Sequence, residues 1–348
     1  MIQTKQRHRH AHAQNIKKQP AVSVALGVFN GEAYIAEQIA SILAQTRPVD
    51  ELIISDNASS DASVSIVQDI ISADQSGTTI VLVESDENVG YTKNFERAIS
   101  HCSGDLIFLS DHDDVWDPAK VEEVESVFQK DPGVSMVYHD AEYTDPSLNL
   151  LGRTVFEQRP YLSREREPRE MIRRPGVKGC CMAFTARVKD AAVPFVPGLG
   201  KDVWLVYIAS ALGRIVPLSR CLILYRRHEG TLSVDDVPGY DSKRVKQQAA
   251  GDRVRTCREE VRRLEVLLAR YTALIEHNED HERRDLLVSQ RAYTGDRLRL
   301  FQRRTRFMEA FSVGLLLKLL VSLVSGEYHR HIPKGVRAFK GDLLAAFS

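Results

Sequence analysis

The sequence predicts an α/β protein followed by a helical extension, and three observations support this fold class. Apolar runs alternate with amphipathic helical patterns through the first half of the chain, which is typical of βαβ units. Between residues 254 and 275, apolar residues recur at alternating spacings of three and four, as helix–helix packing requires. The 348 residues are 43% hydrophobic and 27% charged, which is ordinary for a globular chain and argues against wholesale disorder.

The first half alternates between strands and helices in chain order. Short apolar runs predict strands at residues 22–28, 52–55, 80–83, 106–109, 134–138, 180–184 and 221–225. Amphipathic patterns predict helices at residues 32–45, 62–71, 92–100, 118–128 and 203–212. The stretch from 141 to 174 is polar and irregular, so we expect a loop over a binding cleft.

The second half is expected to be helical. The apolar seam at 254–275 and a further pattern around 286–301 predict a helical hairpin, within one chain or between two. Residues 311–324 are almost wholly apolar apart from Lys318, but they fall short of the roughly 20 residues that span a bilayer. This segment is either a buried helix or an interfacial helix. From Arg291 to the end there are eleven basic residues and four acids, which favours contact with an anionic membrane surface, at about 1 kcal/mol per basic residue.

Composition narrows the class of protein. The 47 basic and 47 acidic residues cancel, so we expect no nucleic-acid partner. There is no CxxC pattern, and three of the five cysteines lie in apolar runs, which predicts buried thiols in a reducing compartment (Cys180, Cys181 and Cys221). We expect a polar, disordered tail with alternating histidines and no secretory signal at 1–20, an α/β domain at 21–240 and a helical, basic region at 241–348.

The strongest chemical motif is Asp111-His112-Asp113-Asp114, directly after the strand expected at 106–109. Carboxylates at the carboxyl end of a strand lie at the crevice where open α/β sheets bind ligands. Two acids separated by one residue can project to the same side of an extended segment. Such oxygen ligands suit Mg²⁺ or Mn²⁺ held together with substrate phosphates. The alternative is a solvated acidic turn that caps the helix beginning near Asp117.

Two further strand ends carry polar loops. In the loop at 55–61, Asp56 can accept a hydrogen bond from a pyrimidine N–H, whereas Asp61 is expected to cap the next helix. Asn88 and Gly90 follow the third strand, and Lys93 beyond them is either a phosphate contact or a surface lysine. Three consecutive strand ends of this kind favour a ligand site.

These motifs resemble the family 2 glycosyltransferases of the GT-A fold, specifically the bacterial rhamnosyltransferase-like group. Six blocks occur in the family's order and cover roughly residues 20–230: VFNG at 28–31, 55–61, 88–95, SDHDDVWDPAK at 110–120, KDVWL at 201–205 and LYRRH at 224–228. The resemblance implies a Rossmann-like mixed sheet with a C-terminal helical extension.

The resemblance also implies roles for individual residues. Asp202 is the implied catalytic base for the acceptor hydroxyl. The implied divalent metal, Mn²⁺ or Mg²⁺, would be held by Asp111, Asp113 and His228. The implied donor-binding residues are Phe29, Asn30, Asp56, Asn88, Gly90, Lys93, Asn94 and Asp111.

The implied reaction is metal-dependent transfer with inversion at the anomeric carbon. The donor would be a UDP- or dTDP-sugar, with rhamnose suggested by the nearest resemblance, and the acceptor a cell-surface glycan or a lipid-linked glycan. The enzyme is expected in the cytoplasm, peripheral to the inner face of the membrane, and an oligomer is compatible with the helical seam.

Two of these residues also have a purely structural interpretation, and two positions differ from the family pattern. Asp202 can instead be a helix N-cap, and His228 a surface residue among arginines. Similar proteins usually have glutamine where His112 stands and histidine where Lys201 stands. A cation at 201 would lower the pKa of Asp202 and weaken it as a base, or would meet an anionic acceptor.

Three other functions compete with glycosyl transfer. A sugar nucleotidyltransferase needs a basic, Gly-rich loop after the first strand, and Phe29-Asn30-Gly31-Glu32 lacks the basic residue. A processive polysaccharide synthase is disfavoured because there is neither a QxxRW motif nor an expected spanning helix. A non-catalytic scaffold is opposed by Asp111, Asp113 and Asp202, although Lys201 keeps it open.

Overall fold

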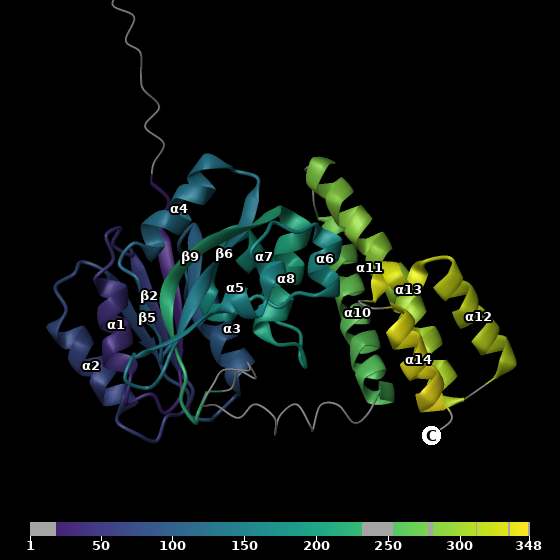
Figure 1. Ribbon diagram of the computed structural model, residues 1–348. Coiled ribbons are helices and arrows are strands. Elements are labelled where there is room, and N and C mark those ends of the chain that lie inside the picture. The colour runs from purple at the N-terminus through teal and green to yellow at the C-terminus, as the bar shows by residue number, and fades with distance from the viewer. Residues whose placement is uncertain (1–18, 232–252, 278–280, 311, 333–334, 347–348) are drawn as a thin grey trace, which may run out of the picture.

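The chain forms one mixed sheet flanked by helices, with further helices at its C-terminal side (Figure 1). The computed structural model describes residues 19–231, 253–277, 281–310, 312–332 and 335–346. The strands are β1 (Val22–Val28), β2 (Glu51–Asp56), β3 (Thr79–Val83), β4 (Leu106–Asp111), β5 (Val115–Trp116), β6 (Val134–Thr144), β7 (Leu150–Thr154), β8 (Met182–Thr185) and β9 (Arg214–Arg226). The predicted α/β class with a helical extension is confirmed.

Helices connect and cover the strands. In the sheet region they are α1 (Ile35–Leu43), α2 (Ser63–Ala73), α3 (Tyr91–His101), α4 (Lys120–Lys130), α5 (Val155–Gln158), α6 (Pro168–Arg173), α7 (Ala186–Ala192) and α8 (Lys201–Leu212), with short 3₁₀ turns at Pro160–Leu162 and Gly179–Cys181. The extension comprises α10 (Arg253–Glu276), α11 (His281–Glu309), α12 (Val313–Val324), α13 (Glu327–His331) and α14 (Gly335–Ala346).

The sheet order is β3-β2-β1-β4-β8-β6-β9-β5, with β7 paired to β6. β1, β2, β3 and β4 are mutually parallel, whereas β8 pairs antiparallel with both β4 and β6. Every residue of β1 is buried, as expected for a parallel strand covered on both faces. Because β1 lies between β2 and β4, the carboxyl ends of these three strands meet at one edge of the sheet.

Residues 141–174 depart from the predicted loop. β6 continues to Thr144, and β7, α5 and α6 follow it. Tyr143 is buried although its neighbours are polar, and Thr154 begins α5 with a capping box to Glu157. Polar residues here cap and pair elements, which the apolar pattern does not reveal.

The helical extension packs on α8, which is buried along nearly all of its length. α10 and α11 lie side by side, within one chain (Figure 1). The Tyr271 hydroxyl of α10 donates to the Tyr207 carbonyl of α8 at 2.9 Å. Most of the predicted tail at 1–20, and the predicted boundary at 240, lie outside the described residues.

Candidate active site

Two predicted acidic loops flank the end of β1. In the parallel pairing, Val28 of β1 is opposite Asp56 of β2, and Gly27 is opposite Asp111 of β4. Asp56 and Asp111 are therefore the last residues of two strands on either side of β1. The sequence predicted this shared rim, and the pairing confirms it.

The loops after β1, β2 and β3 are joined by asparagine side chains. Asn30 has φ of 48°, donates its backbone N–H to Ser59 Oγ at 2.9 Å, and accepts the Ser60 N–H at 2.9 Å. Asn88 Oδ1 accepts from Asn57 Nδ2 at 2.8 Å and from the Gly90 N–H at 2.9 Å. These bonds fix the three loops relative to one another without a ligand.

Asp56 is buried, and its two carboxylate oxygens differ in their hydrogen bonding. Its Oδ2 accepts the Ser59 N–H at 2.9 Å, while Oδ1 has no hydrogen-bond partner among the described residues. A buried carboxylate oxygen left without a donor costs free energy, so an N–H from a nucleobase fits this position. Asp61 instead accepts the Ser63 N–H at 3.0 Å at the start of α2, but the N-cap of α2 is Ala62, so Asp61 lies one residue before the predicted capping position.

Four other residues predicted to bind the donor lie at or beside the same strand ends. Asn94 is buried, and its Nδ2 donates to the carbonyls of Val28 at 3.3 Å and Ser55 at 2.8 Å, so it braces the ends of β1 and β2. Gly90 has φ of 85° immediately before α3, a conformation that favours glycine. Phe29 and Lys93 are exposed beside this rim.

The acidic motif contains carboxylates with contrasting surroundings. Asp111 Oδ1 accepts from the Tyr91 hydroxyl at 3.0 Å. Burial raises the pKa of Asp111, and the charge of Asp113 adds to this rise against the opposing Lys201 ammonium. Burial also opposes ionisation of Asp113, but its hydrogen bond with His228 and the nearby His112 outweigh that effect and lower the Asp113 pKa.

Asp113 and His228 contact each other directly. His228 Nε2 and Asp113 Oδ2 are 2.9 Å apart, an ordinary hydrogen-bond distance. His228 Nδ1 accepts the Gly230 N–H at 3.2 Å, so the ring proton lies on Nε2 and is donated in the hydrogen bond to Asp113. A cation bound between the two residues would replace that proton. The pairing joins the end of β9 to the acidic motif, as the predicted metal set requires.

A second cluster of ligand atoms lies beside this pair. Oxygens of Asp111 and Asp114 and the Cys180 Sγ all fall within 4.8 Å of one another. A hydrogen bond with Cys181, followed by burial, raises the Cys180 pKa well above its usual range. Cysteine sulfur is also a softer ligand than the oxygen ligands that suit Mg²⁺ and Mn²⁺. Asp111, Asp113 and His228 offer the oxygen and imidazole ligands of the predicted metal set, but among the described residues their ligand atoms do not all fall within 4.8 Å of one another.

Asp202 and Lys201 form the first turn of α8. Gly200 is the residue before the helix, so Asp202 lies inside the first turn, and its interpretation as the N-cap is wrong. The fully buried Lys201 ammonium is 3.0 Å from Asp202 Oδ1 and 4.0 Å from Asp111 Oδ1. Burial lowers the pKa of Lys201, but the two carboxylates outweigh that and raise it, so the ammonium stays charged between them.

Aromatic rings complete the Lys201 environment. Its Nζ lies 4.1 Å from the centre of the Tyr91 ring and 4.0 Å from that of Phe95, and it also donates to the Tyr91 hydroxyl. Both rings belong to α3, which follows the loop after β3. Sequence reasoning noted Lys201 as a departure but missed Tyr91, because nothing local shows that it contacts Asp111.

Arg226 is a further residue that sequence reasoning missed. Its buried guanidinium donates from Nε to the Asp113 carbonyl at 2.8 Å and pairs with Glu37, and its backbone N–H donates to Asp114 Oδ1 at 3.2 Å. It therefore holds the acidic motif against the end of β9. Its place in the LYRRH block was the available signal.

Gly179 leaves room for the Asp202–Lys201 pair. A Cβ at Gly179 would lie 2.5 Å from Asp202 Oδ1 and 2.5 Å from Lys201 Nζ. We expect Gly179→Ala to displace both groups and to lower the turnover number by roughly 10- to 100-fold, since misplacement of about 1 Å can cost that much. Steady-state kinetics with any active donor measures the effect.

Gly200→Ala is the matched control for that substitution. A Cβ at Gly200 would meet nothing within 4 Å, and its φ of −64° suits alanine. Equal turnover in the two glycine variants, with both folded, would show that the close approach at Gly179 does not matter.

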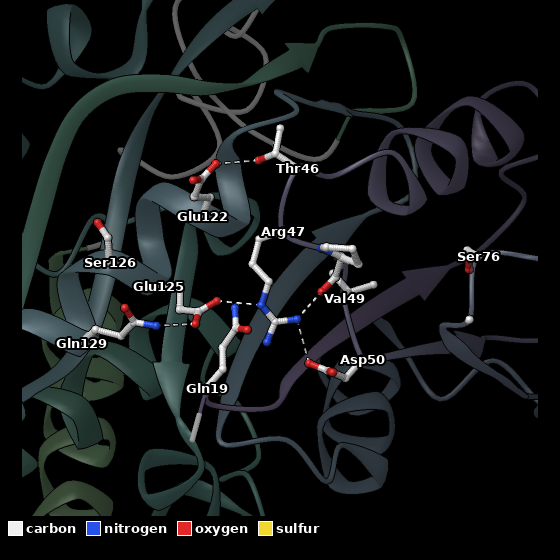
Figure 2. Close-up of a pocket in the computed structure, with 12 residues that line it drawn as sticks. Gln19, Thr46, Arg47, Val49, Asp50, Ser76, Glu122, Glu125, Ser126 and Gln129 are labelled. Atoms are coloured by element: carbon white, nitrogen blue, oxygen red, sulfur yellow. Dashed lines mark hydrogen bonds and ion pairs between the residues drawn. The ribbon is translucent and has the colours of Figure 1, made fainter. Parts of the chain in front are cut away.

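A surface pocket lies at the opposite edge of the sheet (Figure 2). It is lined by residues that precede β2 and β3 and by polar residues of α4. Arg47 there pairs with Glu125 at 2.8 Å and with Asp50 at 3.0 Å, so its charge is matched within the protein. This pocket lies near the amino ends of β2 and β3, whereas Asp56 and Asp111 lie at the carboxyl ends of β2 and β4.

Glycosyltransferases are found among the known proteins that this chain is similar to. Residues 23–191 match the model of glycosyl transferase family 2. The chain is 25% identical over 236 residues to an uncharacterized glycosyltransferase of Nostoc sp., covering 66% of this chain and 71% of that protein. It is 33% identical over 111 residues to EpsE of Bacillus subtilis, whose name assigns it provisionally to the glycosyltransferases. That match covers 32% of this chain and 39% of EpsE, so the chain spans less than half of this relative's length.

A solved structure shares the overall architecture. S. aureus TarS 1-349 in complex with UDP-GlcNAc superposes with a TM-score of 0.54 at 15% identity, covering 92% of this chain and 83% of that chain. This likeness concerns the fold, and it confirms the predicted GT-A architecture with its C-terminal helices.

Proposed function

We propose a specific reaction for this chain, on the premise that it is a glycosyltransferase, because residues 23–191 match the glycosyl transferase family 2 model. The enzyme transfers a sugar from a nucleotide diphosphate donor to a glycan or lipid-linked acceptor, with inversion at the anomeric carbon. The observation that carries the proposal is the Lys201 ammonium, which bridges Asp202 on α8 and Asp111 on β4. A candidate base thereby lies beside the carboxylate that ends the donor-side strand.

The donor is held by the three loops at the strand ends. Asp56 Oδ1 accepts the N–H of a pyrimidine base, and Phe29, Asn30, Asn88 and Gly90 line the surroundings of the nucleotide, while Lys93 is available to a phosphate. Asn94 acts as a positioning residue, because its amide is already bonded to the carbonyls of Val28 and Ser55. UDP- and dTDP-sugars, dTDP-rhamnose among them, are the donors to test.

The transfer step is assigned to Asp202. Its carboxylate accepts the proton of the acceptor hydroxyl while that oxygen bonds to the anomeric carbon and the bond from that carbon to the diphosphate oxygen breaks. One base on the face opposite the leaving group gives inversion. A divalent cation held by Asp111, Asp113 and His228 would stabilise the charge of the departing diphosphate.

Calorimetric titration with a panel of nucleotide diphosphates tests the donor site. We expect UDP or dTDP to bind in the presence of Mn²⁺ or Mg²⁺, and chelation or Asp113→Ala to weaken binding by roughly 10- to 100-fold, as loss of a metal ligand or its partner does. Asp69→Ala, at an exposed acid on α2, is the control and should bind like the wild type. Failure of every nucleotide to bind to the folded protein would instead support a non-catalytic scaffold.

The division of the chain belongs to the same proposal. We assign the transferase domain to residues 21–240 and the helical, basic region to residues 241–348. Cytoplasmic location and contact with an anionic membrane are the accompanying expectations for an enzyme whose acceptor is lipid-linked.

A further inference from the structure

The extension carries a continuous apolar surface on α12. Five side chains are exposed there: Val313 by 66%, Leu317 by 57%, Leu320 by 37%, Val321 by 67% and Val324 by 86%. Their spacings of three, four and one place them on one side of the helix, which we name the α12 face. The opposite side contributes Leu319 and Ser322, which are buried where α12 packs on α11, α13 and α14.

The apolar side chains of the α12 face do not pack into the core of the chain. Single exposed apolar residues are ordinary on protein surfaces, but a contiguous apolar patch marks an interaction site. α12 lies at the outer edge of the extension, with α10 and α11 between it and the sheet (Figure 1). Among the parts of the chain that the structure describes, nothing buries these five side chains.

The exposed charges on α12 and α14 are all positive. Lys318 lies within the exposed part of α12, and Arg337 and Lys340 are exposed on the neighbouring α14. From residue 312 to the end the sequence has two acids, Glu327 and Asp342. Glu327 pairs with Arg303, and Asp342 is buried against Arg304 at 2.6 Å, so both are neutralised within the chain.

α14 repeats the arrangement on a smaller scale. Val336 and Leu344 are 48% and 75% exposed, and Lys340 lies midway between them at intervals of four residues. Two adjacent helices thus each combine exposed apolar side chains with a lysine, whose long apolar stem can lie along a hydrocarbon surface while its ammonium reaches water or a headgroup.

We propose that the α12 face docks onto an anionic lipid bilayer, with α12 lying in the plane of the membrane interface. A helix of 12 residues is about 18 Å long, which suits lying in the interface and is too short for crossing it. Over the described residues, no helix combines the length and apolarity that a membrane span needs. The proposal assigns the membrane contact expected with the proposed function to one helix face, and vesicle binding tests it separately from the transfer reaction.

A second copy of the chain is the alternative occupant, and the charges disfavour it. In a two-fold contact the same patch meets itself, so Lys318 would approach the exposed cations of the other copy. No unpaired acid on α12, α13 or α14 is available to compensate them among the described side chains. An anionic bilayer complements both the apolar side chains and the lysines.

Vesicle flotation of the full chain tests this inference. The wild type is expected to float with vesicles of phosphatidylcholine and phosphatidylglycerol at 7:3, and less with phosphatidylcholine alone. Val321→Asp combined with Val324→Asp should lower the partition coefficient by about tenfold or more, because an interfacial helix binds through its buried apolar area. Lys318→Gln should lower it by roughly three- to fivefold at low salt and by less at high salt.

Leu150→Asp is the matched control, since Leu150 is a 64% exposed apolar residue of β7, outside the extension. All variants are compared by circular dichroism, and little change is expected because every substituted side chain is exposed. A wild type that ignores anionic vesicles, or α12 variants that float like Leu150→Asp, would overturn the proposal. Concentration-dependent dimer mass in light scattering without lipid, lost in the α12 double variant, would assign the face to a second copy instead.

Discussion

Replacing Asp202 by Asn is expected to lower the turnover number of sugar transfer by roughly 10²- to 10⁴-fold, the usual contribution of a positioned general base. Donor binding should change little. The amide has the shape of the carboxylate, and its oxygen can still accept the hydrogen bond that Lys201 gives to Asp202 Oδ1 at 3.0 Å. The variant therefore loses the proton acceptor and keeps the geometry.

Two measurements separate these effects. Transfer is followed with the best donor found by titration, and the nucleotide dissociation constant is measured on the same preparation. Asp190→Asn, at an exposed carboxylate on α7, is the control and should match the wild type in both. Unchanged turnover in Asp202→Asn would remove Asp202 from its role, whereas lost nucleotide binding would make it a donor-site residue.

Lys201→Met is expected to give the second large effect, on stability and on transfer together. The substitution leaves Asp111 and Asp202 without the cation between them, and breaking a buried ion pair from one side costs about 3 kcal/mol or more in free energy of unfolding. The estimate takes the lower end because the two carboxylates remain 21% and 33% exposed. Turnover should fall by more than about tenfold, because the ammonium that holds both carboxylates in place is absent.

Denaturant unfolding and steady-state kinetics check the two parts of this prediction. Lys130→Met, at an exposed lysine at the end of α4, is the matched control and should leave both quantities near the wild-type values. Lys201→His restores the residue expected from the family resemblance, and it should recover part of the stability and turnover. If Lys201→Met were as stable and as active as the wild type, the bridge would have no role in positioning Asp202.

Much of the fold could be predicted from the local pattern of apolar residues. The strand at Val22–Val28 was predicted to the residue because all seven side chains are apolar or small and buried. β6 and β9 were predicted too short, since β6 continues through the buried polar residues His139 and Asp140, which break an apolar run. Burial of polar side chains depends on partners distant in sequence, and hydropathy does not encode it.

The site was predictable where motifs lie at strand ends. Parallel pairing brings Asp56 and Asp111 to one edge, and the Asp113–His228 contact agrees with the implied metal set. The contacts of Tyr91 and Arg226, and the space left by Gly179, could not be predicted. Each depends on a partner more than twenty residues away or, for Tyr91, on the direction of a helix after a glycine turn.

The burial of α8 bears on how this architecture can be divided and recombined. α8 carries Asp202 at its first turn, and its other sides are covered by the sheet and by the extension. Arg270 of α10 donates to the carbonyls of Ala191 at 2.9 Å and Pro194 at 2.7 Å, beside the segment that leads into α8. A chain cut between the two halves would expose the apolar side of the helix that carries Asp202, the proposed catalytic base. The extension is therefore not an interchangeable module, and evolution or engineering must retain or replace it together with α8.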